Sequence, residues 1–226
     1  MAGNRSAVDR DAPGHPLSGI LFDAYGTLFD VYSLGSLAEE LFPRIMFSIT
    51  QKAVPEDALL KTYRGGTHPE RWGTYGDCFA VTVDRAVNLA DFVFAFYTTP
   101  VFRVERLILG GLLGSPSSDS AARALADGSA ASFAVWYVGE RTATQLLMCD
   151  RYERTRSWFR VVPLNDNRTL LQFGSAVAAA RDRQTGALAL GRGFPLLSRF
   201  HVLYSRMLLH AATVRVRRRA RPREVR

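Results

Sequence analysis

The chain has 226 residues, a net charge of +8 at pH 7, 47% hydrophobic residues and 22% charged residues. These values fit one ordinary globular domain and exclude a wholly disordered, collagen-like or coiled-coil chain. No apolar run reaches the roughly 18 residues of a membrane span, and the polar N-terminal sequence lacks the apolar stretch of a secretory signal. Cys78 and Cys149 have no CxxC spacing, so we expect a reducing, cytoplasmic setting.

The positive charge is concentrated at the C-terminus. Residues 215–226, RVRRRARPREVR, hold seven arginines and one glutamate, and so carry six of the eight net charges. The remainder is almost neutral, which excludes a uniformly basic nucleic-acid-binding domain. We expect residues 214–226 to form a basic tail that either aids solubility or contacts nucleic acid or anionic lipid. The tail has no aromatic residue for stacking on bases.

The first 76 residues divide into three parts. Residues 1–16 are polar and contain Pro13, Gly14 and Pro16, as a flexible leader would. Residues 17–43 begin with GILFD followed by AYGT, a pattern typical of a buried strand and a turn. Residues 44–76 are rich in glycine and proline and predict a connecting region with at most one short helix, near 56–63.

From Asp77 onward the pattern becomes regular. Alternating apolar residues predict a strand over 78–84, and Asn88 is a natural N-cap for a helix over 89–97. Apolar residues spaced by three and four predict a second helix over 101–113, and an alanine-rich stretch predicts a third over 119–128.

The last part of the chain predicts an antiparallel sheet followed by a long helix. Strands are expected over 133–138, 145–150, 155–162 and 168–177. Consecutive strands joined by short turns form an antiparallel meander. The helix expected over 196–210 has a wide apolar stripe that a sheet would cover. We therefore predict an α+β domain over residues 77–213.

Residues 20–31, ILFDAYGTLFDV, resemble the first motif of the haloacid dehalogenase (HAD) superfamily, and in particular its 2-haloacid dehalogenase branch. The resemblance implies that Asp23 is a nucleophile that attacks the halogen-bearing carbon, giving an ester that is then hydrolysed. Tyr25 stands where the phosphatase branch has a second aspartate that helps to assemble a Mg²⁺ site. The likeness covers residues 17–43, and no later motif of the family follows. We therefore predict a catalytically silent segment, with a hydrolase using Asp23 as the alternative.

Residues 57–213 resemble an uncharacterised bacterial family, through stretches such as FYTTPVFRVERLIL, SSDSAARALADG and TRSWFRVVP. The order of the expected elements is also similar to the helix-grip or START-like (SRPBCC) architecture. That resemblance implies a curved sheet covered by the long C-terminal helix, with a cavity for a hydrophobic ligand between them.

Aromatic residues of the expected elements are candidates for the cavity wall, although each is also a natural core residue. They are Phe92, Phe96, Trp136, Trp158, Phe173, Phe200 and Tyr204. Arg103 and Arg156 are candidates for polar contacts with the ligand. The strand face that carries Arg156 and Arg160 either faces solvent or turns into the cavity, where Arg156 or Arg160 would pair with a ligand carboxylate or with Glu105.

No pattern predicts a metal or a cofactor. His201 and His210 lie nine residues apart, on opposite sides of the expected helix, and no GxSxG, GxGxxG or GxxxxGK[ST] motif occurs. Our preferred hypothesis is a non-catalytic or weakly catalytic domain that binds a small hydrophobic or amphipathic ligand between the sheet and the C-terminal helix. The alternatives are a HAD-type hydrolase and an interaction protein that acts through its arginine-rich tail.

Overall fold

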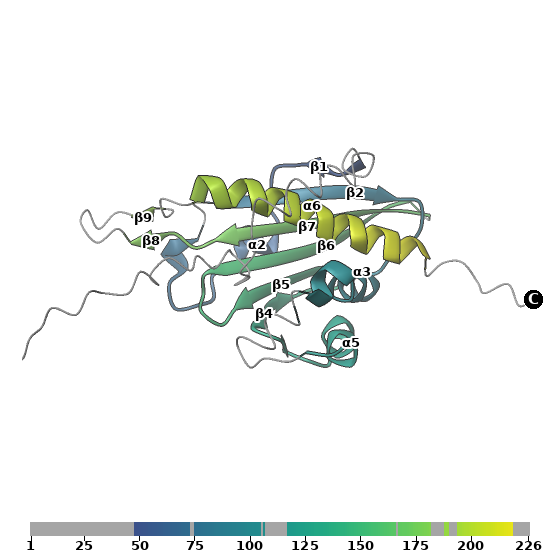
Figure 1. The fold of residues 1–226 in the computed structure, drawn as a ribbon, viewed down its shortest axis with the longest axis horizontal. Coiled ribbons are helices and arrows are strands. Elements are labelled where there is room, and N and C mark those ends of the chain that lie inside the picture. The colour runs from purple at the N-terminus through teal and green to yellow at the C-terminus, as the bar shows by residue number, and fades with distance from the viewer. Residues whose placement is uncertain are drawn as a thin grey trace, which may run out of the picture.

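An antiparallel sheet with helices on its faces forms the described part of the chain (Figure 1). The computed structural model describes residues 48–72, 75–104, 106, 117–165, 167–181, 188–189 and 194–218. Its helical elements are α2 (Leu59–Thr62), the 3-10 turn η2 (Pro69–Arg71), α3 (Leu89–Tyr97), α5 (Asp119–Asp127) and α6 (Phe194–Arg218). Its strands are β1 (Thr50–Gln51), β2 (Tyr75–Val83), β3 (Ser132–Phe133), β4 (Trp136–Arg141), β5 (Gln145–Asp150), β6 (Thr155–Asn165), β7 (Arg168–Val177), β8 (Ala180–Arg181) and β9 (Leu188–Ala189).

Seven strands form the main sheet in the order β1-β2-β7-β6-β5-β4-β3, and all neighbours are antiparallel. The strands from β3 to β7 form the predicted antiparallel meander. The strand expected over 133–138 is instead two short strands, β3 and β4, joined by a tight turn in which Ala134 has φ 51°. β2 comes first among the long strands but lies beside β7, the last of them, with Tyr75 opposite Val177 and Val83 opposite Thr169. The predicted α+β class, with an antiparallel sheet and a C-terminal helix, is confirmed.

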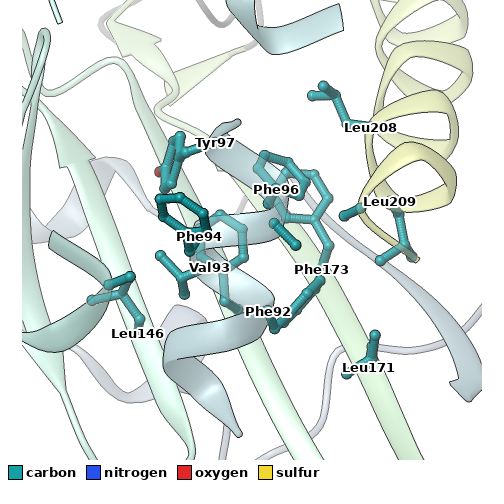
Figure 2. Close-up of a cluster of buried hydrophobic side chains, with 14 of the residues drawn as sticks. Phe92, Val93, Phe94, Phe96, Tyr97, Leu146, Leu171, Phe173, Leu208 and Leu209 are labelled. Atoms are coloured by element: carbon teal, nitrogen blue, oxygen red, sulfur yellow. The ribbon is translucent and has the colours of Figure 1, made fainter. Parts of the chain in front are cut away.

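One face of the sheet packs against helices, and we call it the helical face. Successive side chains of a strand point to opposite faces, so Phe79, Phe159 and Phe173 all lie on this side and join one apolar cluster with α3 and α6. Figure 1 shows α6 lying lengthwise over the sheet beside α3, and Figure 2 shows Leu208 and Leu209 of α6 near Phe173. The main core therefore lies between the sheet and α6.

The opposite face is covered by residues 52–72, and we call it the strap face. Leu59 and Leu60 of α2 pack there with Cys78 and Trp158 in a second apolar cluster. α2 lies inside the range expected for the short helix of the connecting region. This stretch of the chain is thus folded onto the sheet.

Several boundaries are now defined by their contacts. Asn88 caps α3, because its Oδ1 accepts a hydrogen bond from Asp91 N at 2.7 Å. The helix expected over 101–113 is described at 100–104 and 106, and its remainder lies outside the described residues. α6 continues through Arg218 into the expected tail, since Val216 is buried and its carbonyl oxygen accepts from Arg85 Nη1 at 2.6 Å. Residues 1–16 and 17–43 lie outside the described residues.

Candidate functional site

A buried polar cluster lies between the sheet and α6. Asp77 on β2 is opposite Ser175 on β7, and His201 on α6 contacts both side chains. The three residues are 3%, 2% and 6% exposed, respectively. Gly174 allows the strands to approach closely here, because a Cβ at this position would lie 2.6 Å from the carbonyl oxygen of Asp77. The fold therefore brings an acid, a hydroxyl and an imidazole together inside an apolar layer.

All hydrogen-bonding positions of the Asp77 carboxylate are occupied. Oδ1 accepts from Ser175 N at 3.0 Å and from Ser175 Oγ at 2.8 Å. Oδ2 accepts from Tyr75 OH at 2.9 Å and lies 3.1 Å from His201 Nε2. Burial by itself would raise the pKa of Asp77, but the hydrogen bonds and the interaction with His201 outweigh it, so the pKa is below its usual value. The buried carboxylate is therefore held in its ionised form.

The position of the protons follows from this carboxylate. An ionised carboxylate only accepts, so Ser175 Oγ–H donates to Oδ1 and His201 Nε2–H donates toward Oδ2, which assigns the histidine tautomer. Ser175 Oγ, 2.6 Å from Nε2, then accepts from the imidazole. In a serine hydrolase the histidine instead takes the hydroxyl proton. The Asp77, Ser175 and His201 side chains are therefore not arranged as a nucleophilic triad, and Ser175 is not activated for attack.

Tyr75 connects this cluster to the surface. It begins β2, is only partly buried, and its ring lies edge-on to His201 with the ring centroids 6.3 Å apart. Burial and the nearby charge of Asp77 raise the pKa of Tyr75, so its hydroxyl keeps its proton and donates it to the carboxylate. Asp77, Ser175 and His201 are all more deeply buried, so the Tyr75 end is the side of the cluster that is closest to solvent.

Most of the aromatic residues predicted to contact a ligand form the core of the helical face. Phe96 lies 4.7 Å from Phe173 and 6.5 Å from Phe92 between ring centroids, and Figure 2 shows the three side chains converging. Trp136 belongs to the same apolar cluster, as does Tyr204 on α6. Phe200 is also on α6, but its side chain lies outside the described set. The structure thus brings these aromatic residues together and fills much of the interior with their rings.

Trp158 and Arg156 lie on the strap face, away from α6, so their expected place between the sheet and the helix is corrected. Side chains alternate along β6, and Phe159 takes the helical face. Trp158 Nε1 donates to Gln145 Oε1 at 2.8 Å, and the same oxygen accepts from Leu59 N of α2 at 3.0 Å. Trp158 therefore helps to attach the strap to the sheet.

Arg156 is also a strap contact. Its guanidinium lies 3.9 Å from the ring centroid of Trp72 and 4.8 Å from that of Tyr63, and Nη2 donates to the Gly65 carbonyl oxygen at 2.8 Å. The residue is 2% exposed. This strand face therefore looks neither into solvent nor into a cavity under α6, because residues 52–72 cover it, while Glu105 lies outside the described residues.

The remaining predicted site residues lie elsewhere. Arg103 forms an ion pair with Asp119 at the start of α5, together with the buried Arg106. Arg103 thus holds a helix end and does not reach the polar cluster. Asp23 lies outside the described residues, so the hydrolase hypothesis stays a prediction.

Acid should weaken the cluster. The pKa of Asp77 is lower in the folded chain than in the unfolded chain. Ionised Asp77 therefore stabilises the fold fully at pH values above the pKa of an unfolded aspartate, about 3.9. This stabilisation is lost as the pH falls through the lower pKa of the folded chain. We expect the difference in free energy of unfolding between the wild type and Asp77→Asn to shrink below about pH 4. Urea unfolding at a series of pH values measures it. A difference that grows on acidification would contradict the assignment.

Comparisons with family models, curated proteins and solved structures found no match to this chain. Among the described helices, none combines the length and apolar character that crossing a membrane requires. Within the same part of the chain, no three His, Cys, Asp or Glu side chains are grouped closely enough to hold a metal ion.

Proposed function

We propose that this chain is a helix-grip-type domain that binds a small amphipathic ligand between the sheet and α6. Two features of the fold support the proposal. The first long strand, β2, lies beside the last one, β7, and the 25-residue helix α6 lies over the same face of the sheet. This element order corresponds to the helix-grip architecture that the sequence resembles.

The polar cluster carries the proposal. Burying polar and charged groups in an apolar layer is costly unless each finds a partner, and a few convergent polar groups beside apolar side chains are what typically orient an amphipathic ligand. Asp77, Ser175 and His201 lie at the end of the helical face that Tyr75 connects to solvent.

The ligand would take a defined orientation at this end of the sheet. The next side chains on the same face are Phe79 and Phe173, which are opposite each other in β2 and β7. Its polar group would meet Tyr75 and His201, and its apolar part would lie toward these two rings. The packed aromatic cluster under α3, to which Phe173 also belongs, would remain core behind the ligand.

Binding of the neutral fluorescent probe phenylnaphthylamine tests the proposal. We expect saturable binding by the wild type and about tenfold weaker binding by Ser175→Val. The Ser175 hydroxyl holds His201, which would meet the ligand's polar group, and its removal takes away about 1.4 kcal/mol of hydrogen bonding. Thr169→Val is the matched control, because it also removes a buried hydroxyl from the helical face of β7. The Thr169 hydroxyl bonds to the backbone of Arg85 and Val87 and not to the polar cluster.

Two results would refute the site. One is a folded wild type without saturable probe binding. The other is an equal loss of binding in Ser175→Val and Thr169→Val, which would show that the hydroxyls act only through general stability. If the wild type does bind the probe as expected, native mass spectrometry of the purified protein would identify any small molecule that stays bound.

A further inference from the structure

One end of the domain gathers arginines from three separate segments, and we call it the basic end. The turn between β6 and β7 brings Arg168 opposite Asn165. The chain just after β2 lies beside it, since Thr169 Oγ1 donates to the Arg85 carbonyl oxygen at 2.8 Å. Arg85 in turn holds the last turn of α6 through Val216. Figure 1 shows the C-terminal end of α6 at the end of the sheet where β2 finishes.

The basic end has few acidic residues to balance it. Its arginines are Arg85, Arg168, Arg215, Arg217 and Arg218. The ion pair between Arg168 and Asp84 joins atoms 3.5 Å apart, with side chains that are 52% and 85% exposed, so solvent screens it strongly. The turn sequence adds Asp166, but the chain continues after α6 as RARPREVR, with four more arginines and one glutamate. The described residues of the basic end therefore carry more arginines than acidic side chains.

An exposed apolar side chain lies at the same end. Leu164, close to the tip of the hairpin between β6 and β7, is 48% exposed, and the large hydrophobic residues exposed to this degree in the described part of the chain are Val104, Tyr152 and Leu164. Tyr152 lies at the other end of β6, between Arg151 and Arg154, but that turn also holds Asp150 and Glu153. Val104 is the other exposed aliphatic side chain among the described residues, and the nearby Arg103 and Arg106 are both paired with Asp119. Within the described part of the chain, the basic end therefore combines an exposed aliphatic side chain with arginines that are less well balanced by acidic residues.

We infer that the basic end docks on an anionic lipid surface. Basic clusters are attracted to anionic headgroups within about a Debye length, and stable peripheral binding requires a second, apolar signal. Arg168, Arg217 and Arg218 supply exposed cations, and Leu164 supplies the apolar contact. Nucleic acid fits this surface less well, because it offers no apolar layer to an aliphatic side chain, and the described segments named for the basic end include no aromatic side chain for stacking. This inference does not depend on the proposed ligand site.

Vesicle sedimentation with the full chain tests the inference. The wild type should sediment with phosphatidylcholine vesicles in which about a third of the lipid is phosphatidylserine, and not with pure phosphatidylcholine, and added salt should weaken the binding. The combined variant Arg168→Gln, Arg217→Gln, Leu164→Ser should bind about a hundredfold more weakly. The matched control Arg151→Gln, Arg154→Gln, Tyr152→Ser makes the same kinds of change at the other end of β6 and should bind like the wild type.

A second comparison separates lipid from polyanion. Leu164→Ser alone should weaken vesicle binding about tenfold and leave any salt-dependent binding to a short DNA duplex unchanged. The inference is overturned if the wild type does not sediment with the anionic vesicles, or if Leu164→Ser sediments like the wild type. It is also overturned if the two combined variants lose binding equally. Circular dichroism of each variant confirms that it is folded.

Discussion

Asp77→Asn should destabilise the fold by about 1–3 kcal/mol, the usual cost of leaving a buried hydrogen-bond donor without an acceptor. The asparagine side chain has the same shape, but its amide group presents N–H donors where the carboxylate accepts. The asparagine NH₂ group must therefore face hydrogen-bond donors in either orientation of the amide. These donors are Ser175 N and Oγ at the Oδ1 position, or Tyr75 OH and His201 Nε2 at the Oδ2 position. The urea midpoint of unfolding measures the loss.

Asp84→Asn is the control for this experiment. Asp84 pairs with Arg168, but its side chain is 85% exposed, so the variant should leave the unfolding midpoint unchanged. If Asp77→Asn were as stable as the wild type, Asp77 would not be the ionised acceptor at the centre of the cluster. The proposed ligand site would then lose its polar anchor.

Phe96→Ala should cost about 3–5 kcal/mol, as is typical when a large aromatic side chain is removed from a packed core. The Phe96 ring contacts five others, those of Phe92, Tyr97, Phe102, Phe159 and Phe173. Removing it leaves a cavity between α3 and the sheet that these rings cannot close. Thermal or urea unfolding measures the effect.

The same variant distinguishes core from ligand wall. If Phe96 lined an open pocket, truncating it would enlarge the pocket and change stability little. Tyr152→Ala removes an aromatic ring that is 55% exposed and should change stability by no more than about 0.5 kcal/mol. If Phe96→Ala were as stable as Tyr152→Ala, the aromatic cluster would be better interpreted as the wall of a ligand pocket than as packed core.

The local elements of the sheet could be predicted from the sequence. The strand expected over 145–150 is β5, the one expected over 168–177 is β7, and the one expected over 155–162 forms most of β6. These strands follow their alternating side chains and turn residues, both of which act over a few neighbours. The helix over 89–97 could also be predicted from the sequence, because Asn88 is a favourable N-cap residue and caps it in the structure.

The faces of β6 were harder to assign. Its sequence shows that Arg156 and Trp158 share one side of the strand while Phe159 takes the other, but it does not show what covers each side. Residues 52–72, rich in glycine and proline, cover the arginine side through Trp72, Tyr63 and α2. No periodic sequence pattern marks such a covering segment, so only the tertiary structure shows that it covers this face of the sheet.

The polar cluster shows the same limit. Asp77, Ser175 and His201 lie far apart in the sequence, and each occurs in an ordinary strand or helix pattern without a motif around it. The one available signal was a polar residue on the buried face of each element.

The net charge of +8 shows both what the sequence determines and what the tertiary structure adds. The sequence alone determined that the charge is concentrated at the C-terminus, that the domain is α+β, and where β5, β6 and β7 lie, because these properties depend on composition and short-range pattern. Only the tertiary structure decided that Arg85 and Arg168 join the arginines of α6, and that Asp77 meets His201. Such contacts depend on strand register and helix docking, which are set by packing between distant segments and not by any neighbouring residues.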